Sequence, residues 1–390
     1  MRKVYFHSIT GSIGQEVFHV KVFLYYVDYL RSNNIEPTLV FTGKPHNKAL
    51  SILIKRKLNN MRVKYCDLSN NKLFSVFYNR VIMRKTFKFD CNGMAIGHQI
   101  GSTKRYLDYV IHSGCKYAEA KGTYADFEAI NNSNIFLAFS DEENEMAKKE
   151  LKKMKINRDF VCVHARDALF YPKRKHDDMR NIRFESFLPA CNYLSQSGIQ
   201  TIRMGAKQVS VDKKLFNQDI IDYAGEHRTD FMDIWTIANC KFFLCSDSGL
   251  FNVSYMFNKP NAIVNLSSIL YAAPWTQYDI YLPQKIWVRQ EKRFLTFKEI
   301  AKYDIGLDMY CWTSVRYDKE GFECIKSTPE EITDLTKEIN DVLDGKYQYN
   351  EEDNYLQQKF KNIFKVYHSP YHTPARVGRE FLKQNKELFL

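Results

Sequence analysis

The first 43 residues carry a strand, helix and strand pattern of apolar positions. Residues 3–9 predict a strand, and a small-residue turn follows at 10–14. Apolar side chains then recur at helical spacing on one face, at Val17, Val20, Leu24, Val27 and Leu30. Residues 38–41 predict the next strand. This order predicts a parallel pair of strands with a right-handed crossover.

The pattern is weaker between residues 44 and 135. One more strand is expected at 62–66, and the three glycines between 93 and 101 predict a loop. A clear helix is expected after Ser140, because Ser140 is a good N-cap and Glu143 completes a capping box.

The second half of the chain has the clearest rhythm. Strands are expected at 159–163, 199–204, 241–245 and 262–266. Helices are expected at 184–195, 230–239 and 250–257, the second of them with Asp230 as its N-cap. Strands that alternate with helices predict a second parallel α/β sheet. From Thr328 onward the pattern is polar and helical, which fits either a cap on this domain or a return to the first one.

Composition agrees with two ordinary folded domains, since 390 residues include 45% hydrophobic and 26% charged side chains. The aromatic share of 15% suits sugar stacking, or simply large cores. Nine cysteines without a C-x-x-C spacing favour a reduced, cytoplasmic setting over zinc or disulfides. The start of the chain lacks the apolar length of a signal peptide, and no stretch approaches the ~18 apolar residues of a membrane span.

The formal net charge of +12 allows three kinds of partner: nucleic acid, an anionic membrane surface, or phosphorylated small molecules. The basic residues are spread along the chain, and no basic stripe with interleaved aromatics is present. Several lysines crowd one expected helix after Ser140, where a solvated face is sufficient explanation.

Polar side chains follow two expected strands at their carboxyl ends, where open parallel sheets bind ligands. His164, Arg166 and Asp167 follow the first, and an Arg can bind a diphosphate and offset charge on a leaving group. A structural Arg–Asp pair is the alternative. The turn Ser246–Gly249 lies between a strand and a helix, where it suits either phosphate binding or helix capping.

Three further candidates are weaker. Arg203 and Gly205 follow another expected strand, and Gly205 would let a base or ribose approach the backbone closely. In the first domain, Glu16 or His19 suits a general base for an acceptor hydroxyl, although Glu16 could equally complement the helix dipole.

Several motifs are missing from the sequence. It contains no G-x-G-x-x-G, no P-loop, no H-E-x-x-H and no D-x-D. We therefore expect no metal and no cofactor in the chemistry of this protein.

From residue 136 to 270, and faintly at both ends, the chain resembles a family of bacterial surface-polysaccharide glycosyltransferases. The ordered motifs that carry the resemblance are FVCVHARDALFY, HDDMRNI, IQTIRMGA, IIDYAG, TDFMDIWTIANCKFFLCSDSGL, FNKPNAIVNL and FLKQNKELFL. More distantly, the His-x-Arg and the Ser-rich turn look like the donor half of fucosyltransferases with the GT-B fold. In that family a second basic residue follows the Arg, whereas this chain has Asp167.

The resemblance implies an α/β protein of the GT-B type, with two Rossmann-like parallel-sheet domains facing across a cleft. It implies an acceptor domain at 1–155, a donor domain at 156–345 and a helical tail at 346–390 that could cross back to the first domain. His164 and Arg166 would hold the donor diphosphate. Phosphate or ribose would contact Asp247, Ser248 and Gly249, and Arg180 and Asn181 match an Arg-Asn pair of the family.

The sequence thus predicts a metal-independent enzyme that transfers a sugar from a nucleotide-linked donor to a growing surface glycan, which a lipid could carry. It would be cytoplasmic, and its basic surface could hold it at the inner face of the membrane. The rivals are an epimerase that uses nucleotide sugars, a basic nucleic-acid-binding protein, and a sugar-binding subunit without catalytic activity. The donor sugar, the acceptor and the stereochemical outcome stay open.

Overall fold

The structure is a computed structural model that describes residues 2–8, 13–32, 34–41, 44–68, 135–170, 175–206, 211–270, 273–307, 312–365 and 368–390. The loop expected at 93–101 lies outside these residues. The chain divides into two compact units. Unit 1 comprises Met1–Asp141 and Tyr255–Asn258, and unit 2 comprises Glu142–Ser254 and Lys259–Leu390.

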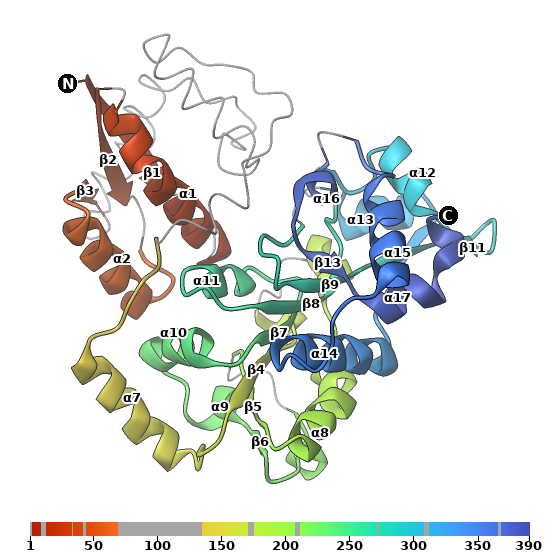
Figure 1. Ribbon diagram of the computed structural model, residues 1–390, viewed down its shortest axis with the longest axis horizontal. Coiled ribbons are helices and arrows are strands. Elements are labelled where there is room, and N and C mark those ends of the chain that lie inside the picture. Colours follow the sequence, from red (N-terminus) through yellow and green to blue (C-terminus); the bar gives the residue numbers. More distant parts are fainter. Residues whose placement is uncertain are drawn as a thin grey trace. The chain divides into compact units, whose positions relative to one another are not determined.

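Unit 1 contains a parallel sheet with strand order β1-β2-β3 (Figure 1). Its elements are β1 (Arg2–Ser8), α1 (Ile13–Ser32), β2 (Ile35–Phe41), α2 (Lys48–Asn60) and β3 (Lys64–Asp67). The apolar stripe expected on α1 is buried along its whole length, so the predicted strand, helix and strand are confirmed. Helix α2 was not predicted, although Asn47 caps it by accepting a hydrogen bond from the Leu50 N–H at 2.9 Å.

A lysine is buried inside unit 1. The Lys21 side chain on α1 is fully buried, and its ammonium donates to the carbonyl oxygen atoms of Tyr255 at 3.1 Å and Ile135 at 3.4 Å. The same ammonium lies 4.1 Å from the ring centre of Phe136. Burial lowers the pKa of Lys21 to about 7. Lys21 therefore ties α1 to two segments that are distant in the sequence.

Unit 2 is built on a seven-stranded parallel sheet with strand order β13-β9-β8-β7-β4-β5-β6. Its strands are β4 (Phe160–His164), β5 (Gln200–Arg203), β6 (Ile220–Ile221), β7 (Phe243–Ser246), β8 (Asn261–Leu266), β9 (Ile280–Pro283) and β13 (Arg376–Val377). The predicted α/β class with parallel sheets is confirmed. The tail that begins at residue 346 belongs to unit 2, where β13 extends the sheet.

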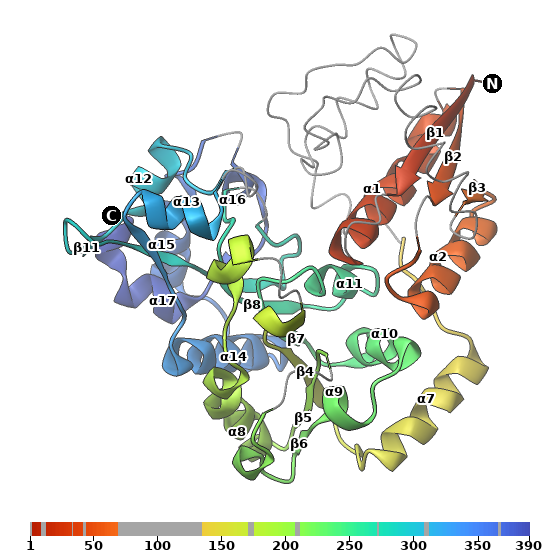
Figure 2. The same cartoon turned by 180° about the vertical axis from the view of Figure 1, so that it is seen from behind.

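Helices of unit 2 lie on both faces of this sheet, and others lie away from it (Figure 1). They are α7 (Asp141–Lys153), α8 (Leu188–Gln196), α9 (Tyr223–Glu226), α10 (Asp230–Asn239), α11 (Phe251–Tyr255), α12 (Phe297–Lys302), α13 (Ser314–Lys319), α14 (Pro329–Leu343), α15 (Glu351–Lys361), α16 (Ser369–His372) and α17 (Arg379–Gln384). Figures 1 and 2 show α8 and α14 side by side on one side of the sheet and α10 on the other.

Two helix predictions need correction. Helix α10 has Thr229 as its N-cap, because the Thr229 hydroxyl accepts from the Met232 N–H at 3.1 Å, and Asp230 is already its first helical residue. The helix expected at 250–257 is shorter, Phe251–Tyr255, since its last turn is replaced by a turn with Asn258 at a positive φ of 54°.

A small antiparallel sheet projects from the large one. It consists of β10 (Lys285–Val288), β11 (Arg293–Phe294) and β12 (Phe322–Ile325), in the order β11-β10-β12. Strand β10 begins one residue beyond Gln284, which directly follows β9. None of these strands was predicted.

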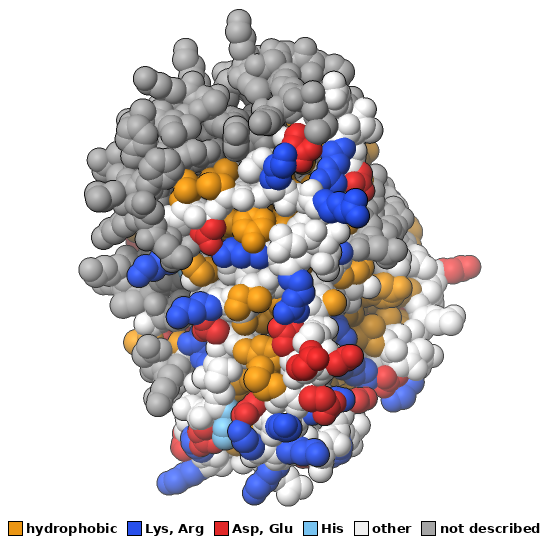
Figure 3. Space-filling model, turned by 90° about the vertical axis from the view of Figure 1, so that its left-hand side faces the viewer, with side chains coloured by type: hydrophobic (Ala, Val, Ile, Leu, Met, Phe, Trp, Pro, Cys, Tyr) orange, Lys and Arg blue, Asp and Glu red, His pale blue; other side chains and the backbone are white. Residues whose placement is uncertain are grey.

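The lysine-rich helix α7 is not a purely basic surface. Within it, Lys148 pairs with Glu145 at 2.7 Å and Lys153 with Glu150 at 2.6 Å, and all four side chains are well exposed. Figure 3 shows acidic and basic side chains interspersed over the face that it draws. These exposed pairs fit the solvated helix face that the sequence favoured.

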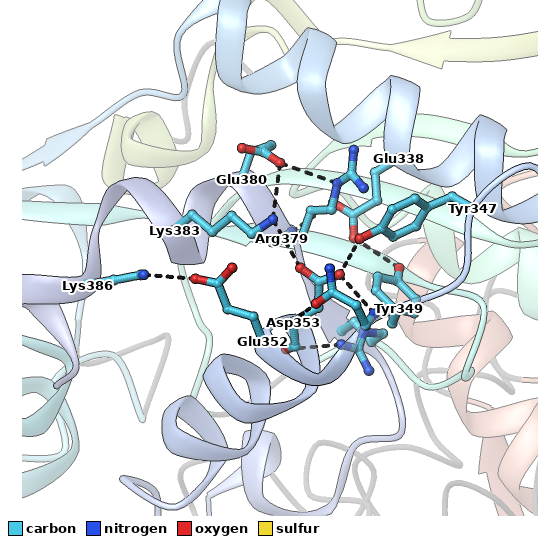
Figure 4. A network of polar contacts seen from close by, with 11 residues as sticks. Glu338, Tyr347, Tyr349, Glu352, Asp353, Arg379, Glu380, Lys383 and Lys386 are labelled. Carbon is cyan, nitrogen blue, oxygen red and sulfur yellow. Dashed lines mark hydrogen bonds and ion pairs between the residues drawn. The ribbon is translucent and has the colours of Figure 1, made fainter.

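A polar network joins the C-terminal helices (Figure 4). At its centre the buried Glu338 on α14 accepts hydrogen bonds from the Arg379 N–H at 2.8 Å and the Tyr349 hydroxyl at 2.9 Å. Asp353 on α15 accepts from the Tyr347 hydroxyl and pairs with Lys383 on α17 at 3.2 Å. The network fixes α14, α15 and α17 against one another.

Candidate functional site

The carboxyl end of β4 gathers most of the predicted donor-side residues. Its neighbours in the sheet are β5 and β7, with Val163 opposite Arg203 and His164 opposite Cys245. His164 is thus the last residue of β4, and Arg166 and Asp167 follow it beyond the sheet edge. Because parallel strands end at the same edge, the segments after β5 and β7 lie beside them.

His164 is held between these segments. Its Nδ1 lies 3.2 Å from the Ser248 hydroxyl oxygen, and a Cβ added to Gly205 would lie 3.6 Å from its Cδ2. Gly205 has a φ of +134°, which residues with a side chain rarely adopt, so the backbone geometry favours a glycine there, while the 3.6 Å to the ring is an ordinary van der Waals distance.

His164 is buried near three guanidinium groups. Burial lowers the pKa of His164 to about 4, and the guanidinium groups of Arg166, Arg203 and Arg228 act in the same direction. The imidazole is therefore neutral at pH 7 and acts as a hydrogen-bonding group. Arg203 pairs with Asp222 at 2.5 Å and Arg228 with Asp233 at 3.0 Å, so the positive charge around this strand end is partly compensated by carboxylates.

Both the backbone and the side chain of Arg166 are held by hydrogen bonds. Its backbone N–H donates to the hydroxyl of the buried Ser246 at 2.7 Å, and its guanidinium donates to the side-chain oxygen of Asn181. The Asn181 amide in turn donates to Asp178 at 3.0 Å. The predicted Arg-Asn pair therefore contributes Asn181 as a neutral partner that orients Arg166.

Arg180 contacts a different candidate, Asp247. The Arg180 guanidinium lies 3.0 Å from one carboxylate oxygen of Asp247, and both side chains are nearly buried, at 13% and 8% exposure. The other carboxylate oxygen accepts from the N–H and the hydroxyl of Ser267, at 3.2 and 2.7 Å. This arrangement pins the segment of residues 178–181 to the turn that follows β7.

Two other predicted residues have protein partners of their own. Arg203 is buried and pairs with Asp222 at 2.5 Å, so its charge is largely compensated. Asp167 accepts a hydrogen bond from the Leu169 N–H at 2.6 Å, which closes a local turn. Arg166 and Asp167 thus each contact other groups of the protein. Gly249 follows Ser248 in the turn before α11.

The two candidate bases belong to unit 1. Glu16 lies in the first turn of α1 and is 2% exposed. Burial raises the pKa of Glu16, while the nearby His46 opposes this shift. His19 also belongs to α1, but its side chain lies outside what the structure describes.

Three residues at the edge of the large sheet escaped sequence reasoning: Lys326, Gln284 and Ser267. Each belongs to a loop after a short strand, and no motif marks any of them. Within the described ranges, no cluster of three or more His, Cys, Asp or Glu side chains is placed to hold a metal ion. The helices in the described part of the chain are also too short or too polar to cross a membrane.

The structure is thus an α/β protein of two compact units, and the carboxyl end of β4 in unit 2 brings most of the candidate residues together. The chain matches no protein-family model and no curated protein. Solved structures with a similar course of the chain include the following three.

A glycosyl transferase of family 9 from Veillonella parvula DSM 2008 is 11% identical, with 72% of this chain and 86% of that chain covered and a TM-score of 0.44. The ADP-heptose lps heptosyltransferase II of E. coli is 13% identical over 67% and 84%, with a TM-score of 0.38. The UDP-GlcNAc 2-epimerase of Methanocaldococcus jannaschii is 10% identical over 85% and 82%, with a TM-score of 0.28. At such values these likenesses assign no function.

Proposed function

We propose that this chain is a glycosyltransferase that moves a sugar from a nucleotide-linked donor to a growing bacterial surface glycan, without a metal ion. Unit 2 binds the donor, and unit 1 binds the acceptor. The observation that carries the proposal is the strand end at His164, where Arg166 is held by Ser246 and Asn181 and His164 lies beside the Ser248 hydroxyl. The ordered sequence motifs around it are the second support.

In this proposal Arg166 binds the donor diphosphate and stabilises the negative charge that grows on it as the sugar departs. A guanidinium suits this role because it stays charged and can bind two phosphate oxygen atoms at once. His164, Ser246 and Ser248 keep the strand end in shape and offer hydrogen bonds to phosphate oxygens. Gly205 leaves room beside β5 for the nucleoside.

In the same proposal, four further residues support the donor site mainly through contacts with other protein groups: Arg180, Asn181, Arg203 and Asp247. The charges of Arg180, Arg203 and Asp247 are held by protein partners, and the neutral Asn181 holds Arg166, so these residues shape the walls in which the donor binds. Asp167 and Gly249 line the same edge through their backbone positions.

Glu16 is the proposed general base of the acceptor side. A carboxyl whose pKa is raised by burial is a better proton acceptor for a hydroxyl than an ordinary exposed one. His19 is the alternative base. The acceptor glycan is proposed to be lipid-linked, with the enzyme in the cytoplasm and at the anionic inner face of the membrane.

A thermal-shift screen of the full chain against UDP, GDP, ADP, CMP and dTDP tests the donor site. A ligand at 100 times its dissociation constant adds about 2.7 kcal/mol of stability. The matching nucleotide sugars are then incubated with and without glycan acceptors. Transfer that releases the nucleotide only with an acceptor supports the proposal.

Other outcomes point to the rivals. Conversion of the sugar without an acceptor would indicate an epimerase, and binding without turnover would indicate a sugar-binding subunit. Absence of nucleotide binding, together with steeply salt-dependent binding to generic DNA, would overturn the proposal in favour of a nucleic-acid-binding protein.

A further inference from the structure

Lys326 reaches the carboxyl edge of the large sheet through the small antiparallel one. Strand β12 pairs with β10, and its last residue, Ile325, lies opposite Lys285. Lys285 comes directly after Gln284, which follows the carboxyl end of β9. The antiparallel pairing therefore brings the chain back to this edge at Lys326.

The contacts of Lys326 confirm this position. Its ammonium donates to the carbonyl oxygen of Asp178 at 3.2 Å and also to that of Met179. The Gln284 side chain donates to the same Met179 oxygen at 2.9 Å. The next residue, Ser327, donates its N–H to the side chain of Asn265, at the end of β8, at 2.6 Å.

The segment that Lys326 touches is the one that orients Arg166. Residues 178–181 carry Asn181, whose side-chain oxygen accepts from the Arg166 guanidinium, and Arg180, which pairs with Asp247. Lys326 and Arg166 therefore contact the same short segment from two different strand ends.

The positive charge of Lys326 is not neutralised by its hydrogen bonds, because both acceptors are neutral carbonyl oxygen atoms. Burial lowers the pKa of Lys326 to about 8; Cys324 and the carboxylates of Asp178 and Asp247 oppose this shift, and the charge of Arg166 adds to it. Both carboxylates already accept hydrogen bonds from other donors, Asn181 and Arg180. An anion between the two repelling cations would relieve their repulsion.

Unused hydrogen-bonding atoms lie in the same region. The side-chain oxygen of Gln284 and the side-chain nitrogen of Asn265 are buried without a hydrogen-bond partner, in residues that are 5% and 0% exposed. Buried polar atoms normally have partners, so this edge has hydrogen-bonding capacity that the protein itself does not fill.

The order of strands separates the two cations along the edge. Gly205 follows β5, Arg166 follows β4, and Lys326 lies by the end of β9, on the far side of β7 and β8. A nucleotide whose nucleoside lies near Gly205 would therefore extend its phosphates from Arg166 toward Lys326.

We propose that Lys326 binds the distal phosphate of a nucleoside diphosphate, next to a proximal phosphate that Arg166 binds. The assignment rests on the proposed function, since it presumes a nucleotide at this edge. It makes Lys326 a donor-binding residue that exchanges its carbonyl partners for phosphate oxygens when the nucleotide arrives.

The test compares diphosphate and monophosphate affinities by calorimetry, with the tightest nucleoside diphosphate of the thermal-shift panel and its monophosphate. Lys326→Met keeps the apolar stem and removes the charge. This variant should weaken the affinity for the diphosphate roughly tenfold to a hundredfold, the scale of a lost charged hydrogen bond. It should change the affinity for the monophosphate less than about twofold. Lys326→Arg should retain most of the diphosphate preference.

Lys319→Met is the matched control, because Lys319 is exposed and lies on α13 just before β12. It should leave both affinities unchanged. Diphosphate binding by the wild type should also take up protons near pH 8, measured in buffers of different ionisation enthalpy, and Lys326→Met should abolish this uptake.

The outcomes separate the two proposals. A wild type that binds no nucleotide overturns the proposed function. A wild type that prefers the diphosphate, with the same preference in a folded Lys326→Met variant, overturns only the role of Lys326. Equal loss of both affinities, with a lower melting temperature, would show that Lys326 merely holds residues 178–179, and would overturn it as well.

Discussion

Replacement of Glu338 by Gln should flatten the pH dependence of stability in unit 2. The Glu338 side chain is 2% exposed, and burial raises its pKa from 4.5 to about 7. The Arg379 N–H, the Tyr349 hydroxyl and the charges of Arg379 and Arg376 oppose this rise without cancelling it. The folded protein therefore keeps a proton on Glu338 that the unfolded chain has released.

The sign follows from this difference in bound protons. Between pH 4.5 and about 7 the folded state binds more protons, so the free energy of unfolding falls as the pH rises, by about 1.4 kcal/mol for each pH unit. The stabilising contribution is complete below pH 4.5 and is lost as the pH rises through about 7. Across this pH window the titration of Glu338 should lower the free energy of unfolding by roughly 3 kcal/mol.

Denaturant unfolding at pH 5, 6, 7 and 8 measures the effect. All four tryptophans, at 235, 275, 287 and 312, belong to unit 2, so their fluorescence reports on the unit that contains Glu338. Glu338→Gln stays neutral and should lose less stability than the wild type between pH 5 and 7. Glu330→Gln, an exposed change on the same helix, should follow the wild type. Parallel curves for wild type and Glu338→Gln would refute the reasoning.

Three further outcomes are expected. Arg166→Ala should lower turnover about a hundredfold to a thousandfold with little change in melting temperature, and Arg166→Lys should restore only part; near-normal turnover of a folded Arg166→Ala protein would contradict the site. Arg180→Met should cost about 3–5 kcal/mol in denaturant unfolding, because it leaves the Asp247 carboxylate buried without its cation, and adding Asp247→Asn should recover much of this; additive losses would argue against the pair. Activity should survive EDTA, whereas a complete loss that magnesium or manganese restores would show a metal-dependent enzyme.

The sequence by itself determined the elements that depend on local periodicity. The stripe of α1 and the alternation of β4, β5, β7 and β8 with helices were readable, because one buried helix face and continuous apolar strands are properties of neighbouring residues. The placement of His164 and Arg166 beside Ser246 and Ser248 also followed, since parallel strands end at one edge.

The local sequence pattern predicted helix boundaries less well where two residues could serve as the N-cap or where polar residues hid a helix. Thr229 and Asp230 are both good N-caps, and only the hydrogen bond to the Met232 N–H decides for Thr229. Helix α2 has a buried face, at Leu50, Leu53, Ile54 and Leu58, but its lysines and asparagines conceal it in the pattern.

Only the tertiary structure decided which distant groups meet. The pairing of Arg180 with Asp247, the burial of Lys21 among the carbonyls of Ile135 and Tyr255, and the arrival of Lys326 through β12 all join residues far apart in the chain. Nothing in a local window encodes such contacts, because they depend on strand order and on the path of each crossover. The charge of a side chain is visible in the sequence, whereas the partner that neutralises it is set by the fold.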